Sequence, residues 1–343
     1  MVMIMAAPTS NNRIIQIHPS RQCNLQCLHC YSSSGPTVKD ALPLELLQTL
    51  LDDASQEGYS VASFSGGEPL LYEGLVPLMD HAHSLGMSTS MVSNGMLLTE
   101  KRLEALQGSL DILAISLDGR PETHNRMRNQ ERAFEIMKGR LPALREANIP
   151  FGFVFTVSKK SIRDFEWVVD FALKEGATLL QVHALEETGR AEETLMGISP
   201  DNRLASYVYL QVIRAKKKLG NRLQIQIDLT HQQSMKSSPA SFYALPVDEL
   251  ASASLSDMVS PLIVETSGRV VPLEYGFGQT YSLGNLKEQR LSQMALEWKS
   301  SGYPDFIKLC GRVFNELTIP QKLPIMDWYA QMSEQSRTTP AAC

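Results

Sequence analysis

The alternation of short apolar strands with amphipathic helices in the first half of the chain constrains the fold more than any other feature. Six such βα units follow one another, and this pattern is typical of a parallel sheet covered by helices. Six units can form an open, curved partial barrel with its chemistry at the carboxyl ends of the strands. The sequence therefore predicts an α/β fold built on a partial (βα)6 barrel. The expected strands are 13–18, 60–65, 87–92, 110–117, 150–157 and 178–184.

Helix signals separate these strands. Gly58 and Gly86 stand where the first two helices should end, because glycine readily adopts the left-handed conformation that terminates a helix. Thr99 is the expected N-cap of the next helix. Ser161 and Asp164 fit a capping box. The expected helices are 44–57, 75–85, 100–106, 132–147 and 162–174.

The regular alternation of strands and helices ends after residue 186. Ser267-Gly268 lies between two apolar runs and indicates a hairpin turn. The expected elements are a helix at 200–219, a loop or linker at 234–256, a hairpin at 261–272, and helices at 286–300 and 324–335. The expected domains are an extension at 1–12, the barrel at 13–220, a linker at 221–256, a small α+β module at 257–320, and a C-terminal helix and tail at 321–343.

Composition excludes several classes of protein. The chain has 343 residues and a formal net charge of -5, which argues against a general nucleic-acid binder. No apolar run is long enough to span a bilayer, so we expect no membrane association. The N-terminus lacks the basic start of a secretory signal, which favours a cytoplasmic location. Five cysteines are too few for a disulfide framework in a chain of this length.

Three of the cysteines form a cluster with metal-binding spacing. Cys23, Cys27 and Cys30 follow the pattern C-x3-C-x2-C in the loop after the first strand. Thiolates bind iron and zinc well, and close spacing lets one loop surround one centre. Three cysteines leave one corner of a cubane 4Fe–4S cluster open for a substrate or cofactor. From spacing alone, a zinc site completed by His29 or a distant residue remains the alternative.

Further motifs follow the later strands in a fixed order. They are Ser65-Gly66-Gly67-Glu68-Pro69, Val92-Ser93-Asn94-Gly95, Ser116-Leu117-Asp118-Gly119, His124-Asn125-Arg126-Met127-Arg128 and Gly189-Arg190-Ala191. Together with the cysteine loop, this order resembles the radical S-adenosylmethionine (SAM) superfamily over about residues 13–191. The resemblance implies a partial barrel of the radical SAM type.

The resemblance also implies the cofactors. Cys23, Cys27 and Cys30 would hold three irons of one 4Fe–4S cluster, and the fourth iron would bind SAM. Reductive cleavage of SAM would yield a 5′-deoxyadenosyl radical that abstracts hydrogen from an unactivated C–H bond. The cofactor would carry the difficult chemistry, while the protein positions it and excludes water.

The same motifs supply candidate SAM contacts. Gly66 and Gly67 would let the backbone approach SAM, since neither carries a Cβ, and Glu68 would accept from the methionyl ammonium. His29 would lie near the adenine, or is an ordinary loop histidine. Arg128 would pair with the SAM carboxylate. Arg126 is a competing candidate for this contact, and Arg128 could instead be an ordinary surface arginine. The ribose or methionyl candidates, which could instead be strand-end caps, are Ser93, Asn94 and Ser116.

The C-terminal module resembles a SPASM or twitch domain whose cluster ligands have been lost. The stretch 264–273 looks like the start of such a domain, but Leu273 stands where its second cysteine should be. We therefore expect one cluster per chain. Cys310 is a candidate catalytic, radical-quenching thiol, although a buried small apolar role is the favoured interpretation. Cys343 should be an inert tail residue.

The resemblance favours a maturase of ribosomally made peptides (RiPPs) that acts on a precursor peptide. The expected reaction is a cross-link, an epimerisation or a backbone excision; thioether formation is also open. Segments 1–12 and 321–343 are too short for a typical domain, so we expect a separate leader-recognition protein, with flavodoxin or ferredoxin as reductant. One alternative is a radical SAM enzyme acting on a sugar, an alcohol or an antibiotic intermediate. A non-enzymatic metal-binding regulatory protein is the other.

Overall fold

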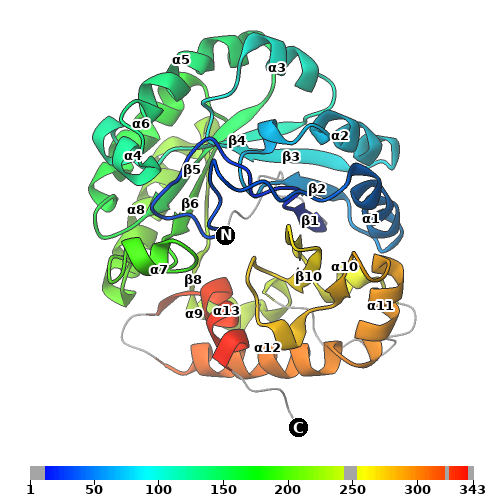
Figure 1. The fold of residues 1–343 in the computed structure, drawn as a ribbon. Coiled ribbons are helices and arrows are strands. Elements are labelled where there is room, and N and C mark those ends of the chain that lie inside the picture. The colour runs from blue at the N-terminus through cyan, green and yellow to red at the C-terminus, as the bar shows by residue number, and fades with distance from the viewer. Residues whose placement is uncertain (1–11, 243–252, 321–323, 339–343) are drawn as a thin grey trace.

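The barrel sheet extends across both halves of the chain. The structure is a computed structural model that describes residues 12–242, 253–320 and 324–338. Within these ranges, ten strands form one curved sheet in the order β11-β10-β9-β1-β2-β3-β4-β5-β6-β7, with helices on its outer side (Figure 1). This arrangement confirms the predicted α/β partial barrel.

All six predicted strands are present and pair in parallel, in sequence order. Their boundaries differ from the predicted ones by one or two residues. They are β1 Ile14–Ile17, β2 Val61–Phe64, β3 Ser88–Ser93, β4 Ile112–Ser116, β5 Phe151–Val157 and β6 Leu179–Ala184.

The predicted helices of the barrel are present too, and Thr99 is confirmed as an N-cap residue, but the predicted capping box is wrong. Thr99 stands at the N-cap, yet its side chain makes no capping hydrogen bond. Ser161 and Asp164 do not form a capping box: the Ser161 hydroxyl donates to the Thr156 carbonyl, and Asp164 accepts from the Arg120 amide. The barrel helices are α1 Leu44–Gln56, α2 Leu75–Ser84, α3 Glu100–Leu106, α4 Pro121–Arg128, α5 Ala133–Glu146 and α6 Phe165–Glu175. Of these, α4 was not predicted.

The second half differs more from the predictions. The hairpin is confirmed as β9 Leu262–Val264 and β10 Arg269–Pro272. The predicted linker 221–256 is wrong, because it contains β7 Gln224–Ile227, which extends the barrel sheet. The other elements are α7 Ala191–Thr194, α8 Asn202–Leu219, β8 Leu229–His231, α9 Gln232–Ser237, α10 Leu255–Met258, β11 Gly284–Asn285, α11 Leu291–Ser300, α12 Tyr303–Thr318, β12 Ile325–Asp327 and α13 Trp328–Thr338. The sequence did not predict β7, β8, α12 or β12. The end of the predicted tail, 339–343, lies outside the described residues.

The C-terminal module is joined to the barrel by strand pairing. β9 lies parallel to β1, with Ile15 opposite Leu262 and Ile17 opposite Val264. Strands 245 or more residues apart in the sequence are therefore neighbours in one sheet. The pairing places the residues after β10 beside the open side of the barrel.

The two faces of the barrel strands differ in polarity. Ile15 and Ile17 of β1 are fully buried in the apolar core beneath the helices. Because side chains alternate along a strand, Gln16 points to the inner side of the barrel. Gln16 is in register with Ser63 of β2, which in turn is in register with Ser90 of β3. The inner side therefore carries buried polar groups, which a purely structural core would avoid.

None of the described helices has the length and apolar character needed to cross a membrane.

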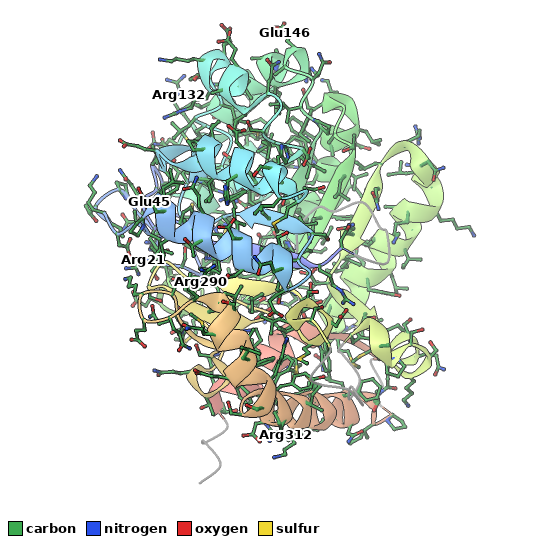
Figure 2. All side chains as sticks on the ribbon, turned by 90° about the vertical axis from the view of Figure 1, so that its right-hand side faces the viewer. Arg21, Glu45, Arg132, Glu146, Arg290 and Arg312 are labelled. Carbon is green, nitrogen blue, oxygen red and sulfur yellow. The ribbon has the colours of Figure 1, made fainter. Side chains whose placement is uncertain are left out.

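The contact between α1 and α11 predicts one effect on stability. Asp53 is buried, and its carboxylate accepts from Arg290 Nη2 at 2.6 Å and from the Ser292 amide at 3.2 Å. Arg290 is labelled in Figure 2, at the start of the orange helix α11. Asp53→Ala should lower the free energy of unfolding by about 1–3 kcal/mol, because it leaves these donors without their charged acceptor. Urea denaturation measures this change.

Asp305→Asn is the matched control. Asp305 is paired with Lys308 on the surface, and its loss should change the free energy of unfolding by less than about 0.5 kcal/mol. Equal losses in the two variants would contradict the proposed role of Asp53.

Candidate active site

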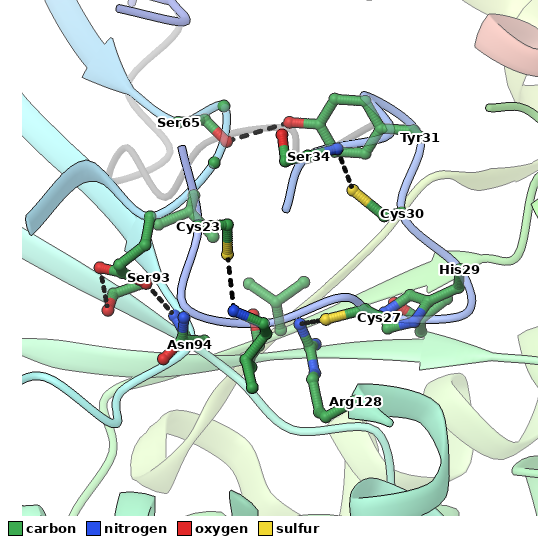
Figure 3. A pocket seen from close by; sticks show the side chains of 18 of the residues that line it. Cys23, Cys27, His29, Cys30, Tyr31, Ser34, Ser65, Ser93, Asn94 and Arg128 are labelled. Carbon is green, nitrogen blue, oxygen red and sulfur yellow. Dashed lines mark hydrogen bonds between the residues drawn. The ribbon is translucent and has the colours of Figure 1, made fainter. Parts of the chain in front are cut away.

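The three cysteines of the loop after β1 line one pocket at the carboxyl ends of the strands (Figure 3). Cys23 and Cys27 are buried, Cys30 is half-buried, and all three are free thiols. The same pocket is lined by the other predicted cofactor residues: Gly66, Gly67, Glu68, Ser93, Asn94, Ser116, Arg128 and His29. The fold thus brings the whole predicted set together.

Backbone hydrogen bonds hold the cysteine loop in place. The Gly67 amide donates to Ser20 O at 2.8 Å, and the Glu68 amide donates to Gln22 O at 2.9 Å. A Cβ on Gly67 would lie 2.1 Å from Gln22 O. Gly67 was predicted to allow close approach to SAM, but the structure shows first that it allows close approach to the cysteine loop. A side chain here would push the loop away.

The far side of the loop is held by the segment after β6. The Arg190 guanidinium donates to Cys27 O at 2.8 Å and to Ser34 O at 2.7 Å. A Cβ on Gly189 would lie 2.2 Å from Tyr31 O. Gly189 and Arg190 therefore position the loop backbone, which explains chemically why the Gly-Arg pair is needed there.

Glu68 connects the ends of β2 and β3. It is only 2% exposed, and its carboxylate accepts from Ser93 Oγ and from the Asn94 amide, both at 2.9 Å. Burial raises the pKa of Glu68, although these hydrogen bonds act in the opposite direction. Asn94 in turn donates to Asn24 Oδ1 at 2.8 Å, within the cysteine loop.

Arg128 has a buried partner that the sequence did not reveal. Its Nε and Nη2 donate to the two oxygens of Asp118 at 2.6 and 3.1 Å, and its Nη1 lies 3.8 Å from Cys27 Sγ. Burial alone would raise the pKa of Asp118, but Arg128 and His29 bring it well below its usual range. The pairing of Arg128 with the SAM carboxylate stays a prediction; in the structure the charge of Arg128 is balanced by Asp118. The competing Arg126 is exposed and lies outside the pocket.

The residues of the pocket fit an iron–sulfur cluster. Burial raises the pKa of Cys23 to about 12 and also raises the pKa of Cys27, so both remain thiols until a metal displaces their protons. Thiolates are the ligands that such clusters prefer, and the Arg128 guanidinium donates to the sulfur of one of these cysteines, Cys27. Among the described residues, no three His, Cys, Asp or Glu side chains converge on a single ion. The ligands of an iron–sulfur cluster bind different irons, so three thiols that do not converge on one ion are still compatible with a cluster.

Comparison with known proteins decides the family of this domain. The family model described as "Radical SAM superfamily" matches residues 17–172. This part of the chain is a radical SAM domain. The cofactors of that family are a 4Fe–4S cluster and SAM, which agrees with the cysteine loop and its pocket.

Two curated relatives have different names. The sporulation killing factor maturation protein SkfB of Bacillus subtilis is 29% identical over 214 residues, covering 62% of this chain and 51% of SkfB. An AdoMet-dependent heme synthase of Methanosarcina barkeri is 31% identical over 193 residues, covering 55% of each. The chain thus spans about half the length of the curated relatives it matches.

Solved structures of radical SAM proteins share the fold. Streptococcus suis SuiB bound to S-adenosylmethionine superposes with a TM-score of 0.67 at 17% identity, covering 86% of this chain and 68% of SuiB. The anSMEcpe structure with AdoMet and the Kp18Cys peptide gives 0.67 at 19% identity, covering 96% and 91%. At these identities the similarity shows the fold alone.

The two remaining cysteines of the chain lie away from the pocket or outside the described residues. Cys310 is fully buried in α12, within the apolar core, and does not line the pocket. Burial raises its pKa to about 12. The structure therefore does not bring the candidate catalytic thiol to the site. Leu273, at the lost cysteine position, is buried with a φ of 61°. Cys343 lies outside the described residues.

Sequence reasoning missed several residues that line the cofactor pocket, among them His183 and Glu186. His183, near the end of β6, is buried, and its Nδ1 is hydrogen-bonded to the carboxylate of Asp228 after β7. Glu186 follows β6 and lines the pocket as well. The available signal was the pair of polar side chains at Gln181 and His183, two residues apart in an otherwise apolar strand.

Glu68 gives a direct test of the pocket. Glu68→Ala should weaken SAM binding by about tenfold or more, because it leaves the Asn94 amide and the Ser93 hydroxyl without their acceptor. Anaerobic equilibrium dialysis with SAM measures the affinity, and an iron assay should show that the cluster is retained. Exposed Glu73, on the same segment, provides the control Glu73→Ala, which should bind SAM normally. Equal affinities in the two variants would refute this role.

Proposed function

We propose that this chain is a radical SAM enzyme that modifies a ribosomally made precursor peptide. The observation that carries the proposal is the convergence of three thiols with Glu68 and Arg128 in one pocket at the carboxyl ends of the barrel strands. The relative SkfB is named as a maturation protein, and a SuiB structure is titled as bound to the precursor peptide SuiA. Both support a peptide as the substrate.

In this proposal Cys23, Cys27 and Cys30 hold the cluster. When bound, the 4Fe–4S cluster together with SAM supplies a radical that abstracts hydrogen from the substrate. Arg128 donates toward Cys27 Sγ and favours the thiolate over the thiol. Asp118 balances the Arg128 charge, so that the pocket does not bury an unpaired cation.

The remaining pocket residues would orient SAM. Glu68 would accept from its ammonium while keeping Ser93 and Asn94 in place. Ser116 lies at the carboxyl end of β4 and would contact the ribose or methionyl group. His29 has a buried Nδ1 without a partner among the described residues, which makes it available to the adenine. Gly66 and Gly67 have no Cβ, which lets the backbone of this segment lie close to the cysteine loop.

The proposal includes partners. A reductant such as flavodoxin or ferredoxin would supply the electron, and a separate protein would recognise the leader peptide by adding a strand to a sheet edge. The edges of the described sheet are β11 and β7. Cross-linking, epimerisation and backbone excision all begin with hydrogen abstraction, so the pocket is compatible with each.

A tetrapyrrole substrate is the second candidate. It is favoured by the similarity to AdoMet-dependent heme synthases, one of them 31% identical over 193 residues. Mass spectrometry distinguishes the two functions. With SAM and reductant, the protein should change the mass of a precursor peptide encoded beside its gene, or incorporate deuterium from D2O if it epimerises. Conversion of an iron porphyrin with an unchanged peptide would establish the second candidate instead.

Metal content provides a separate prediction. The anaerobically reconstituted protein should hold about four irons per chain and form 5′-deoxyadenosine from SAM under strong reductant. Cys23→Ala, Cys27→Ala and Cys30→Ala should each lower the iron content and abolish SAM cleavage, because the cluster loses a ligand. Cys310→Ala is the matched control and should keep both properties, since Cys310 lies in the core. Zinc in place of iron would overturn the proposed function.

A further inference from the structure

A cleft with a basic rim lies beside the cysteine loop. It has a volume of about 420 Å³ and is formed by α4, by the turn after β5 and by the segment after α7. One of its lining residues, Glu122, is acidic, whereas four are basic and exposed, although the chain as a whole is acidic. The basic residues are Arg126, Lys159, Lys160 and Arg163. We call this feature the basic cleft.

The charge of the basic cleft is not neutralised by carboxylates of the chain. None of its four cations forms a salt bridge within the described residues. Lys159 donates to the carbonyl of Gly197 at 3.0 Å, which is a neutral partner. Besides Glu122 on the rim, Glu187 faces this side: the Gly197 amide is the main cause that lowers the pKa of Glu187, and the charge of Lys159 adds to it. Cations therefore outnumber acids at the basic cleft.

The floor of the basic cleft is apolar and contacts the cysteine loop. Met127, Leu195 and Ile198 line the cleft. They pack in one apolar group with Leu28, the residue directly after Cys27. The Leu28 amide also donates to the Met127 carbonyl at 2.9 Å. The basic cleft is thus the outer side of a layer whose inner side is the cysteine loop.

The last turn of α4 connects the basic cleft to a predicted cluster ligand. Met127 lies in the floor of the cleft, and the next residue, Arg128, donates to Cys27 Sγ at 3.8 Å (Figure 3). Electron transfer between proteins weakens steeply with distance. A donor must therefore dock where little protein separates it from the cluster, and the basic cleft meets this condition.

Resting on the proposed function, we infer that the basic cleft is the docking site of an acidic electron-transfer protein that reduces the cluster. One electron passes from the docked donor to the cluster held by Cys23, Cys27 and Cys30, so the donor is oxidised by one electron and the cluster is reduced by one. Redox complexes have small interfaces, and complementary charge speeds their formation. A cationic rim around an apolar floor has the composition of such an interface.

A second basic group provides a comparison of equal charge. Lys216, Lys217 and Lys218 are exposed in the last turn of α8. α8 leads into β7, which runs parallel to β6. The end of α8 therefore lies toward the amino ends of the strands, whereas the cysteine loop lies at their carboxyl ends. A donor bound at the end of α8 would be on the wrong side of the barrel for transfer.

The test compares these two basic groups in the reconstituted, SAM-bound protein. The cleft variant is Lys160→Gln/Arg163→Gln, and the matched control is Lys216→Gln/Lys218→Gln; each removes two positive charges from exposed positions. Isothermal titration with oxidised, acidic flavodoxin measures binding without any turnover. The cleft variant should bind it about tenfold more weakly than the wild type, and the control should change its affinity by less than about twofold.

The rate of cluster reduction is the second measurement. Photoreduced flavodoxin is mixed with the protein, and freeze-quench electron paramagnetic resonance follows the reduced cluster. At low salt the second-order rate constant should fall about tenfold in the cleft variant and remain unchanged in the control. Raising the ionic strength from about 0.01 to about 1 M shortens the screening length from about 30 to about 3 Å, so it should slow the wild type more than the cleft variant.

A small reductant separates this inference from the proposed function. With dithionite, which needs no docking site, both variants should cleave SAM at the wild-type rate. If the wild type does not cleave SAM with dithionite, the proposed radical SAM activity is overturned, while flavodoxin binding still tests the basic cleft. The single variants Lys160→Gln and Arg163→Gln replace the double variant if it fails to fold.

Three results would overturn the docking site. The first is an equal loss of flavodoxin binding in the cleft variant and the control, which would show unspecific attraction by charge. The second is a wild type that binds neither the flavodoxin nor an acidic ferredoxin tested in parallel. The third is a cleft variant that keeps flavodoxin binding but loses affinity for an acidic leader peptide, because the basic cleft would then be a peptide site.

Discussion

Close backbone contact around the cysteine loop is the constraint on which the rest of the site depends. Three thiols can serve one centre only if their loop keeps its shape, and the loop contains no regular element. Gly67 on one side and Gly189 on the other touch its carbonyl groups at distances that leave no space for a Cβ. Arg190 then donates to two more carbonyls of the loop. The loop is thus held by backbone groups on both sides.

The polar side chains of the pocket act as a connected network. Glu68 joins the ends of β2 and β3, because it accepts from the Asn94 amide. The Asn94 side chain in turn donates to Asn24 of the cysteine loop. On the opposite wall, Asp118 holds Arg128 against Cys27. Buried charges of this kind are favourable only when each is paired, because removal of one partner leaves the other uncompensated in a poorly solvated place. The network therefore supports both the fold and the chemistry.

The C-terminal half completes the barrel. β9 pairs with β1, and β7 extends the sheet at the other end. Leu273, at the position where the resemblance to a SPASM or twitch domain would predict a cysteine, is buried in the core.

The sequence by itself determined the barrel strands, the cysteine loop and the motif residues of the pocket, since strand periodicity and motif order are local properties of the chain. It also indicated that Cys310 is a core residue. It did not reveal that Arg128 is paired with Asp118, that β9 lies beside β1, or that α12 exists. These features depend on contacts between segments far apart in the chain, such as Ile17 and Val264, and on burial. Only the tertiary structure sets which charges share a poorly solvated space, and therefore which of them are paired and which remain open to a ligand.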